Sequence, residues 1–237
     1  MAVAKMSFHV ALPEDAMTRL VELAEAEQKR ERKWIAERRR ELMPPSASRR
    51  AAADIRRGIR VEVAAKRRTG EFGGSRDELL TRAVREELRA RGLDREWPDP
   101  PEGEVDAPGR RWGTPPSQPL GAGGYNARLS LNLPADLGET VRRAAYWTSK
   151  PAVEALQEWA DRWGDGPEVT LREATRDSIP AALALLAAAG RPSAPQSVLE
   201  IRESIRQQVV TTGDLIRAAV DRLILDRQPK LPDTSSR

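Results

Sequence analysis

The sequence predicts a mostly helical protein that contains one small antiparallel β-ribbon. Aromatic residues make up only 4% of the 237 residues, so the apolar core has to come from leucine, valine and alanine, which recur at helical spacing along most of the chain. Two short segments instead alternate apolar and polar side chains, as strands do. These two segments belong to an internal repeat, which suggests that each is the other's partner.

The clearer strand covers residues 128–133, followed by a proline. Its leucines fall on one face and Arg128, Ser130 and Asn132 fall on the other, because successive side chains of an extended chain point to opposite sides. Pro134 ends the strand, since proline has no N–H to give to a β-ladder.

Two helical patterns follow Pro134. Leu137, Val141 and Ala144 or Ala145 recur every three or four residues, which predicts a first helix with one buried face. Ser149 is predicted as the N-cap of a second helix, with Pro151 in its first turn. Residues 128–163 therefore read as strand, helix, turn and helix.

The beginning of the chain repeats this pattern. Residues 7–26 align without a gap on residues 128–147, and Pro13 falls on Pro134. Phe8, Val10 and Leu12 are expected to face inward, with Ser7, His9 and Ala11 facing outward. Because a single strand leaves its backbone groups unpaired, we expect the two strands to form one ribbon, within a chain or across a dimer.

The second helix of the first copy does not follow at once. A helix starting after Pro13 is expected to run on toward Leu42, and a further helix from Ser48 to about Arg67. Ser75 then caps a helix that resembles the expected second helix. The first copy, residues 1–97, is therefore predicted to be split by an insertion at residues 27–74.

The insertion is strongly basic. Residues 29–68 hold fifteen Lys or Arg and five Asp or Glu, a net charge of +10 in a chain of net charge +4. Such a surface indicates phosphate contacts, and the candidates are Arg38, Arg39, Arg40, Arg56 and Arg57. The alternative is a solvated pair of helices without a ligand.

The order of strand, helix, turn and helix at residues 128–163 resembles the ribbon-helix-helix family of DNA-binding proteins, which includes MetJ and Arc. The resemblance implies a tandem pseudo-dimer whose two strands enter the major groove of double-stranded DNA. It implies base contacts by Arg128, Ser130, Asn132, Ser7 and His9, and phosphate contacts at the start of each second helix by Ser149, Lys150, Ser75 and Arg76. Two departures are the long insertion in the first copy, and Trp147 and Thr148 where the family often has glycine.

The remaining segments lack strand patterns. Residues 98–126 are predicted as a linker, because residues 98–124 include seven prolines and six glycines. The second copy is taken as residues 127–164. Residues 165–228 show three helical patterns, beginning near Ser178, Gln196 and Thr212, and are expected to pack or to bind a protein partner. Residues 229–237 are expected to be a disordered tail.

The expected function is sequence-specific binding of double-stranded DNA, by a transcriptional regulator such as a repressor or by a plasmid partition or transfer accessory factor. The alternative is a helical protein-interaction module, or an antitoxin, whose basic arm binds an acidic partner. No enzyme activity and no cofactor are expected, since the sequence has no phosphate-binding glycine loop before a lysine, no cysteine and only one histidine, His9. Without an apolar run of eighteen residues, we expect a cytoplasmic, nucleoid-associated protein.

Overall fold

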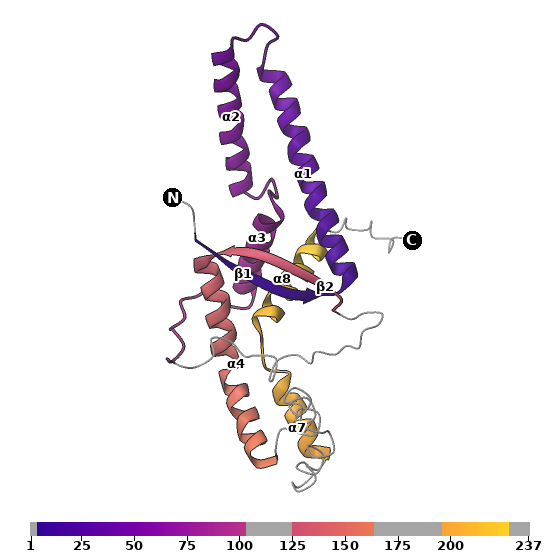
Figure 1. The fold of residues 1–237 in the computed structure, drawn as a ribbon, viewed down its shortest axis with the longest axis vertical. Coiled ribbons are helices and arrows are strands. Elements are labelled where there is room, and N and C mark those ends of the chain that lie inside the picture. The colour runs from indigo at the N-terminus through magenta and orange to yellow at the C-terminus, as the bar shows by residue number, and fades with distance from the viewer. Residues whose placement is uncertain (1–3, 103–124, 164–195, 228–237) are drawn as a thin grey trace, which may run out of the picture. The chain divides into compact units, whose positions relative to one another are not determined.

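The computed structural model describes residues 4–102, 125–163 and 196–227. Its elements are β1 (Lys5–Leu12), α1 (Glu14–Leu42), α2 (Arg49–Arg68), α3 (Arg76–Ala90), β2 (Ala127–Pro134), α4 (Ala135–Trp163), α7 (Gln196–Arg206) and α8 (Thr212–Asp226) (Figure 1). The described chain is mostly helical and has one two-stranded antiparallel sheet. This confirms the coarse fold class, a mostly helical protein with a small antiparallel ribbon. The helix expected near Ser178, most of the predicted linker and the C-terminal tail lie outside the described residues.

The chain divides into two compact units that do not follow sequence order. Of the described residues, the first unit contains 4–94, 125–139 and 215–227, and the second contains 95–102, 140–163 and 196–214. Helices α4 and α8 each pass from one unit to the other. The first unit holds the ribbon and the basic insertion.

The ribbon forms within one chain, which is one of the two arrangements that the repeat allows. β1 and β2 pair antiparallel, with Lys5 opposite Pro134, His9 opposite Ser130 and Leu12 opposite Ala127. In the gapless alignment of the two repeats, His9 and Ser130 are equivalent positions. The register is therefore symmetric about this pair, so each half of the ribbon repeats the other.

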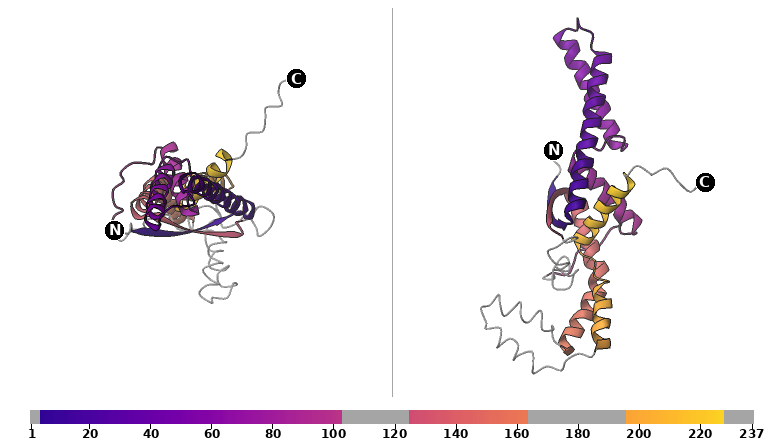
Figure 2. Two further views of the ribbon diagram at one scale, coloured as in Figure 1. Left: turned by 90° about the horizontal axis from the view of Figure 1, so that it is seen from above. Right: turned by 90° about the vertical axis from the view of Figure 1, so that its right-hand side faces the viewer.

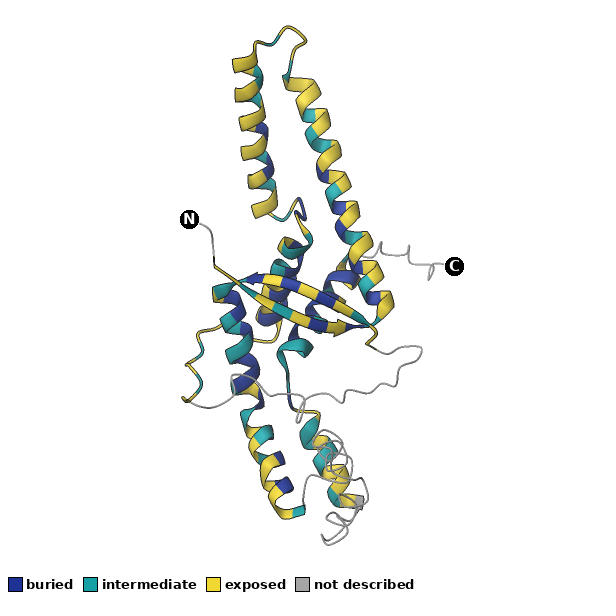
Figure 3. Cartoon of the chain, in the orientation of Figure 1, coloured by how far each residue is buried: buried dark blue, intermediate teal, exposed yellow. Residues whose placement is uncertain are grey.

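The two faces of the ribbon differ sharply in exposure. Val10, Leu12, Leu129, Leu131 and Leu133 are all at most 4% exposed, and they alternate with exposed residues along both strands (Figure 3). Helices α1, α3 and α8 lie on the same side of the ribbon (Figure 2). The apolar face is therefore the core face, and burying it against helices is what makes a two-stranded ribbon stable.

The insertion forms a helical hairpin with one apolar seam. α1 is 29 residues long and continues past the repeat to Leu42. α2 begins after Ser48, whose side chain accepts a hydrogen bond from the Ala51 N–H. Ile59, Val63 and Phe72 form a buried cluster against which Trp34 and Ile35 of α1 pack. Both helix predictions are confirmed.

Helix α3 begins with a complete capping box. The Glu78 N–H donates to Ser75 Oγ, and the Ser75 N–H donates to the Glu78 carboxylate. Gly74, with φ +75°, supplies the left-handed turn before the cap, a conformation that is costly for residues with a Cβ. The N-cap predicted at Ser75 is confirmed.

Helix α8 repeats α3 without a gap. When Thr211–Ile224 is aligned on Ser75–Leu88, five apolar positions of α3 fall on five apolar positions of α8, and all ten residues are buried. In α3 they are Leu79, Leu80, Ala83, Val84 and Leu88, and in α8 they are Leu215, Ile216, Ala219, Val220 and Ile224. The internal repeat thus continues beyond the strands and first helices into these two shorter helices.

Helix α4 corrects the prediction of a turn in the second copy. The chain is helical without a break from Ala135 to Trp163, with Pro151 inside the helix. Ser149 therefore does not cap a second helix. Its hydroxyl is fully buried and bonds the backbone of Val210 twice, accepting from the N–H at 2.7 Å and donating to the carbonyl at 2.8 Å. This tertiary contact replaces the expected cap.

The second unit is built around that contact. Ala152, Leu156 and Val209 form a small buried cluster, with Val153 and Ile205 packed against it. The indole N–H of Trp159 donates to the Val198 carbonyl at 3.3 Å, and that of Trp147 donates to the Pro98 carbonyl at 2.8 Å. Helix α4 is therefore joined to α7 by apolar packing and the Trp159 hydrogen bond, and to Pro98 by the Trp147 hydrogen bond.

Candidate nucleic-acid interface

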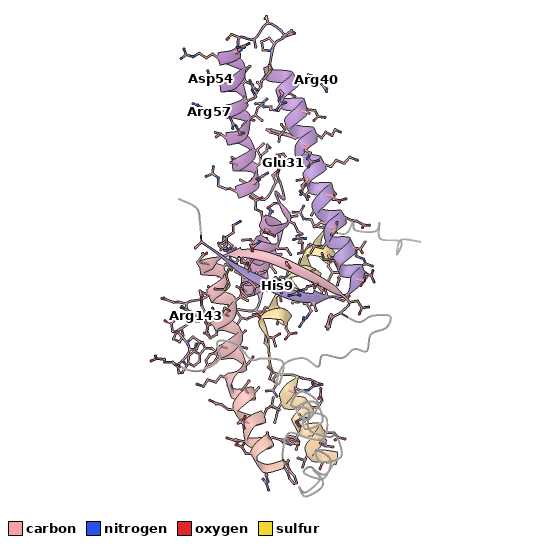
Figure 4. All side chains as sticks on the ribbon, in the orientation of Figure 1. His9, Glu31, Arg40, Asp54, Arg57 and Arg143 are labelled. Carbon is pink, nitrogen blue, oxygen red and sulfur yellow. The ribbon has the colours of Figure 1, made fainter. Side chains whose placement is uncertain are left out.

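The exposed face of the ribbon gathers all five residues for which the sequence predicts base contacts. Ser7, His9, Arg128, Ser130 and Asn132 are exposed and alternate with the buried positions on both strands. Figure 4 shows His9 near the middle of the ribbon. Ser7 Oγ donates to Asn132 Oδ1 at 2.7 Å, and His9 Nδ1 lies 3.0 Å from Ser130 Oγ. Cross-strand pairs thus order this polar face before any ligand arrives.

Helix α3 reaches the edge of this face through two side chains. Arg76 donates to the backbone carbonyl of Ser130 at 2.9 Å, and Asp77 accepts from the Asn132 amide at 3.3 Å. Arg76 therefore fixes α3 to β2, and its guanidinium is partly occupied. Asp77 was not predicted from the sequence, because nothing in the pattern of α3 indicates that its first turn meets β2.

The N-terminus of α3 is already satisfied by its own side chains. Burial by itself raises the pKa of Glu78, but the two hydrogen bonds with Ser75 and the nearby charges of Arg67 and Arg82 leave that pKa below its usual value. The Glu78 carboxylate therefore stays ionised beside the N–H groups at the start of α3, where the family resemblance implies a phosphate contact. Ser75 and Arg76 lie near the ribbon, but a phosphate has to share this helix end with Glu78.

The second predicted phosphate site is not formed at Ser149 and Lys150. Ser149 is buried in the middle of α4, which offers no free N–H groups to an anion. Lys150 Nζ lies 3.3 Å from Tyr146 Oη and 3.9 Å from a Glu154 carboxylate oxygen. The prediction failed because it required a helix to begin at this point.

The five predicted arginines of the insertion fall into different environments. Arg38 is ion-paired with Glu62 and Glu41, both at 3.1 Å, and the hydrogen bonds with these carboxylates raise its pKa. Arg39, Arg40, Arg56 and Arg57 are exposed and form no ion pair with a carboxylate of the described residues. Of the five arginines, only these four could bind an anionic ligand without first leaving a carboxylate.

An open hollow of about 1590 Å³ connects the insertion to the ribbon. Its walls come from α1, α2 and α3, and at one end from the ribbon residues Lys5, Asn132 and Pro134. Nine Lys or Arg and four Asp or Glu line it: Lys5, Arg39, Arg56, Arg60, Arg67, Arg68, Arg82, Arg85 and Arg89 against Glu31, Asp77, Glu78 and Glu86. Arg39 and Arg56 belong to this lining, whereas Arg38, Arg40 and Arg57 do not.

The described residues contain no group of three or more His, Cys, Asp or Glu side chains placed to hold a metal ion. Over the same residues, every helix is too short or too polar to cross a membrane. Comparison with protein-family models, with curated proteins and with solved structures gave no match. The geometry of the ribbon and of the basic hairpin is therefore what points to a function.

Proposed function

We propose that this chain binds double-stranded DNA sequence-specifically, with β1 and β2 inserted together into the major groove. The observation that carries the proposal is the register of the ribbon, which is symmetric about His9 and Ser130. A ribbon of this symmetry presents equivalent positions of the two repeats to two halves of a binding site. In this proposal the chain is a tandem ribbon-helix-helix protein in which one polypeptide supplies both halves.

The chemistry of the exposed face supports this use. The major groove is about 12 Å wide and admits a two-stranded ribbon. Arg128 can form a bidentate pair with guanine, and Asn132 can do the same with adenine. Ser7 and Ser130 can donate to or accept from either kind of base edge. The leucine face cannot serve this purpose, because it is buried.

The structure also supports a different division of the second copy from the one that the sequence suggested. In each copy a strand is followed by a helix of 29 residues, α1 or α4, and later by a helix of 15 residues, α3 or α8. Between them stands an extension, which contains α2 in the first copy and α7 in the second. We propose that α8, and not the second half of α4, is the second helix of the second copy.

A capping arrangement at the start of α8 matches the one at α3. The Asp214 N–H donates to Thr211 Oγ1 at 3.1 Å, and the Thr211 N–H donates to Asp214 at 2.8 Å. Thr211 and Asp214 are the positions that align with Ser75 and Glu78. The two copies thus share the strand, both helices and the cap, which is more than the strand pattern alone suggested.

Among DNA-binding roles, transcriptional regulation and plasmid partition or transfer both use such a ribbon, and the protein is proposed to act in one of them at the nucleoid. The direct test is selection of binding sites from a random duplex library with the purified chain. We expect one enriched motif with two related halves, and no enrichment by a Ser130→Asp variant that places a carboxylate on the exposed face. Equal recovery of all duplexes by the wild-type chain, together with tight binding to an acidic protein, would instead identify a protein-interaction module.

A further inference from the structure

We infer that the hollow between the basic hairpin and α3 binds the phosphodiester backbone of DNA that extends past one end of the ribbon. This inference rests on the proposed function and adds a second contact surface to it. The hollow opens at the Lys5 and Pro134 pair, which is the last pair of the ribbon on that side. DNA seated on the ribbon would therefore reach the hollow at one of its two ends only.

The charge in the hollow is largely free to act on a ligand. Among its acids, Glu31 is held by Arg67 at 2.7 and 3.0 Å, and Glu78 is held by the cap of α3. Five cations of the hollow are not held by a carboxylate in this way. Lys5, Arg39, Arg56, Arg60 and Arg68 form no ion pair with a carboxylate of the described residues. Arg56 and Arg60 each donate one N–H, from Nε, to a backbone carbonyl of α2. A polyanion entering the hollow therefore meets five cations that do not first have to leave a carboxylate partner.

The spacing of these cations suits a nucleic-acid strand. Arg56 and Arg68 stand twelve residues apart on α2, a rise of about 18 Å along the helix. One strand of DNA carries a phosphate for about every 3.4 Å of axis, so this length corresponds to about five phosphates. The hollow is therefore long enough for a run of phosphates.

The hairpin is braced, so the helices that carry most of these cations keep their positions. Arg67 bridges α2 to Glu31 of α1 with two hydrogen bonds, and Glu31 faces the gap between these helices (Figure 4). Lys66 lies over the ring of Trp34 at 5.3 Å. Arg82 of α3 donates to the carbonyls of Phe72 and Gly73 and so ties the connection after α2 to α3. An ordered cationic wall loses less conformational entropy on binding than a mobile arm does.

The test compares two variants that each lose four positive charges from the same hairpin. The hollow variant carries Arg39→Gln, Arg56→Gln, Arg60→Gln and Arg68→Gln. The control variant carries Arg40→Gln, Arg49→Gln, Arg50→Gln and Arg57→Gln, all exposed and outside the hollow. All eight arginines lack an ion pair with a described carboxylate, so both variants should melt as the wild type does.

Binding to the selected site is measured at five salt concentrations. Each lost phosphate contact reduces the slope of log affinity against log salt by about 0.9, so the hollow variant should lose up to about 3.6 and the control variant less than about 1. Trimming the duplex on the side that reaches the hollow should weaken wild-type binding at least about tenfold, because several phosphate contacts are lost. Trimming the duplex on the other side should leave wild-type affinity unchanged. The affinity of the hollow variant should change with neither trimming.

Equal slopes for the two variants would overturn the inference, because a diffuse field would then account for the charge effect. Equal sensitivity to trimming on both sides would overturn it as well. These failures differ from failure of the proposed function. A wild-type chain that selects a motif while its two variants behave alike refutes the hollow alone, whereas a wild-type chain without any preferred motif refutes the ribbon.

Discussion

His9 and Ser130 lie 121 positions apart in the sequence and face each other across the ribbon, with His9 Nδ1 3.0 Å from Ser130 Oγ. They are also equivalent residues of the internal repeat. A residue can pair with its own counterpart only at the centre of a two-fold arrangement. The two copies differ at this centre, so the arrangement is approximate, and a bound operator is expected to have two similar but unequal halves.

The buried face of β2 should not tolerate a charge. Leu131 is 1% exposed and lies opposite Phe8, and removing an unpaired carboxylate from water costs several kcal/mol against a total stability of about 5–15 kcal/mol. We expect Leu131→Asp to abolish the cooperative thermal transition. Ser130→Asp, one position along the strand on the exposed face, should melt as the wild type does. A folded Leu131→Asp protein would contradict the pairing of the strands.

Ser149 should contribute to stability and not to DNA binding. Replacing it by alanine leaves the Val210 N–H and carbonyl without their partner, at a cost of about 1–3 kcal/mol. Thr148→Ala, at an exposed neighbouring position, serves as the control. Denaturant unfolding and duplex binding are measured for both. A loss of affinity in the folded Ser149→Ala protein, without a loss of stability, would restore the phosphate contact that was first predicted here.

Much of the fold follows from patterns in the sequence because the ribbon depends on local alternation and on a gapless repeat. Leu129, Leu131 and Leu133 mark the core face by themselves, and Pro134 marks the end of the strand. The helix start at Ser48 and the cap at Ser75 also form as predicted, and in both cases the serine hydroxyl accepts from the N–H three residues later.

The second copy was misread at Ser149 because a local signal competed with a tertiary one. Serine before Pro151 is typical of a helix start, but the hydroxyl bonds Val210, sixty-one residues away, and α4 continues. The likeness of α8 to α3 is visible in the sequence, but no strand stands directly before α8, so the sequence alone did not assign α8 to the second copy. Asp77 beside Asn132, and the sorting of arginines into and out of the hollow, depend on packing that no spacing rule encodes.

Glu87 should make the first unit sensitive to acid. It is 4% exposed, and burial by itself would raise its pKa, but hydrogen bonds from Arg91 and Arg222 outweigh burial and leave the pKa below the ordinary value of a glutamate. A lowered pKa means that the stabilisation is complete above about pH 4.5 and is lost as pH falls through the folded-state pKa. Unfolding free energy should therefore decline below about pH 4.5.

The variant Glu87→Gln isolates this effect. At pH 7 it should lose about 1–2 kcal/mol of unfolding free energy, because a neutral amide bonds the two half-exposed arginines less strongly than the carboxylate does. Its stability should also fall less steeply below pH 4.5 than that of the wild type. Glu86→Gln, at an exposed neighbouring position, should match the wild type in both respects. Equal acid profiles for Glu87→Gln and the wild type would show that other carboxylates set the acid limit.

Asp77 should weaken DNA binding, since its carboxylate lies at the edge of the exposed ribbon face, 3.3 Å from the Asn132 amide nitrogen. Asp77→Asn should raise affinity about fivefold at low salt, because a like charge near a phosphate costs about 1 kcal/mol in water, and the gain should shrink as salt increases. Asp54→Asn, on the outer side of α2 (Figure 4), removes the same charge away from the ribbon. Titrations in which both variants gain equally would place Asp77 outside the interface.

The central claim is that the exposed ribbon face reads bases, and the most direct measurement is site selection with single alanine variants of Arg128 and Asn132. If each makes a bidentate contact, each contributes about 1–3 kcal/mol of discrimination at one base pair. The account predicts that Arg128→Ala relaxes the preference for a guanine and Asn132→Ala the preference for an adenine, each at its own position of the motif. Both variants should keep the rest of the wild-type motif. Selection of the unchanged motif by both variants, with unchanged affinity, would contradict the account.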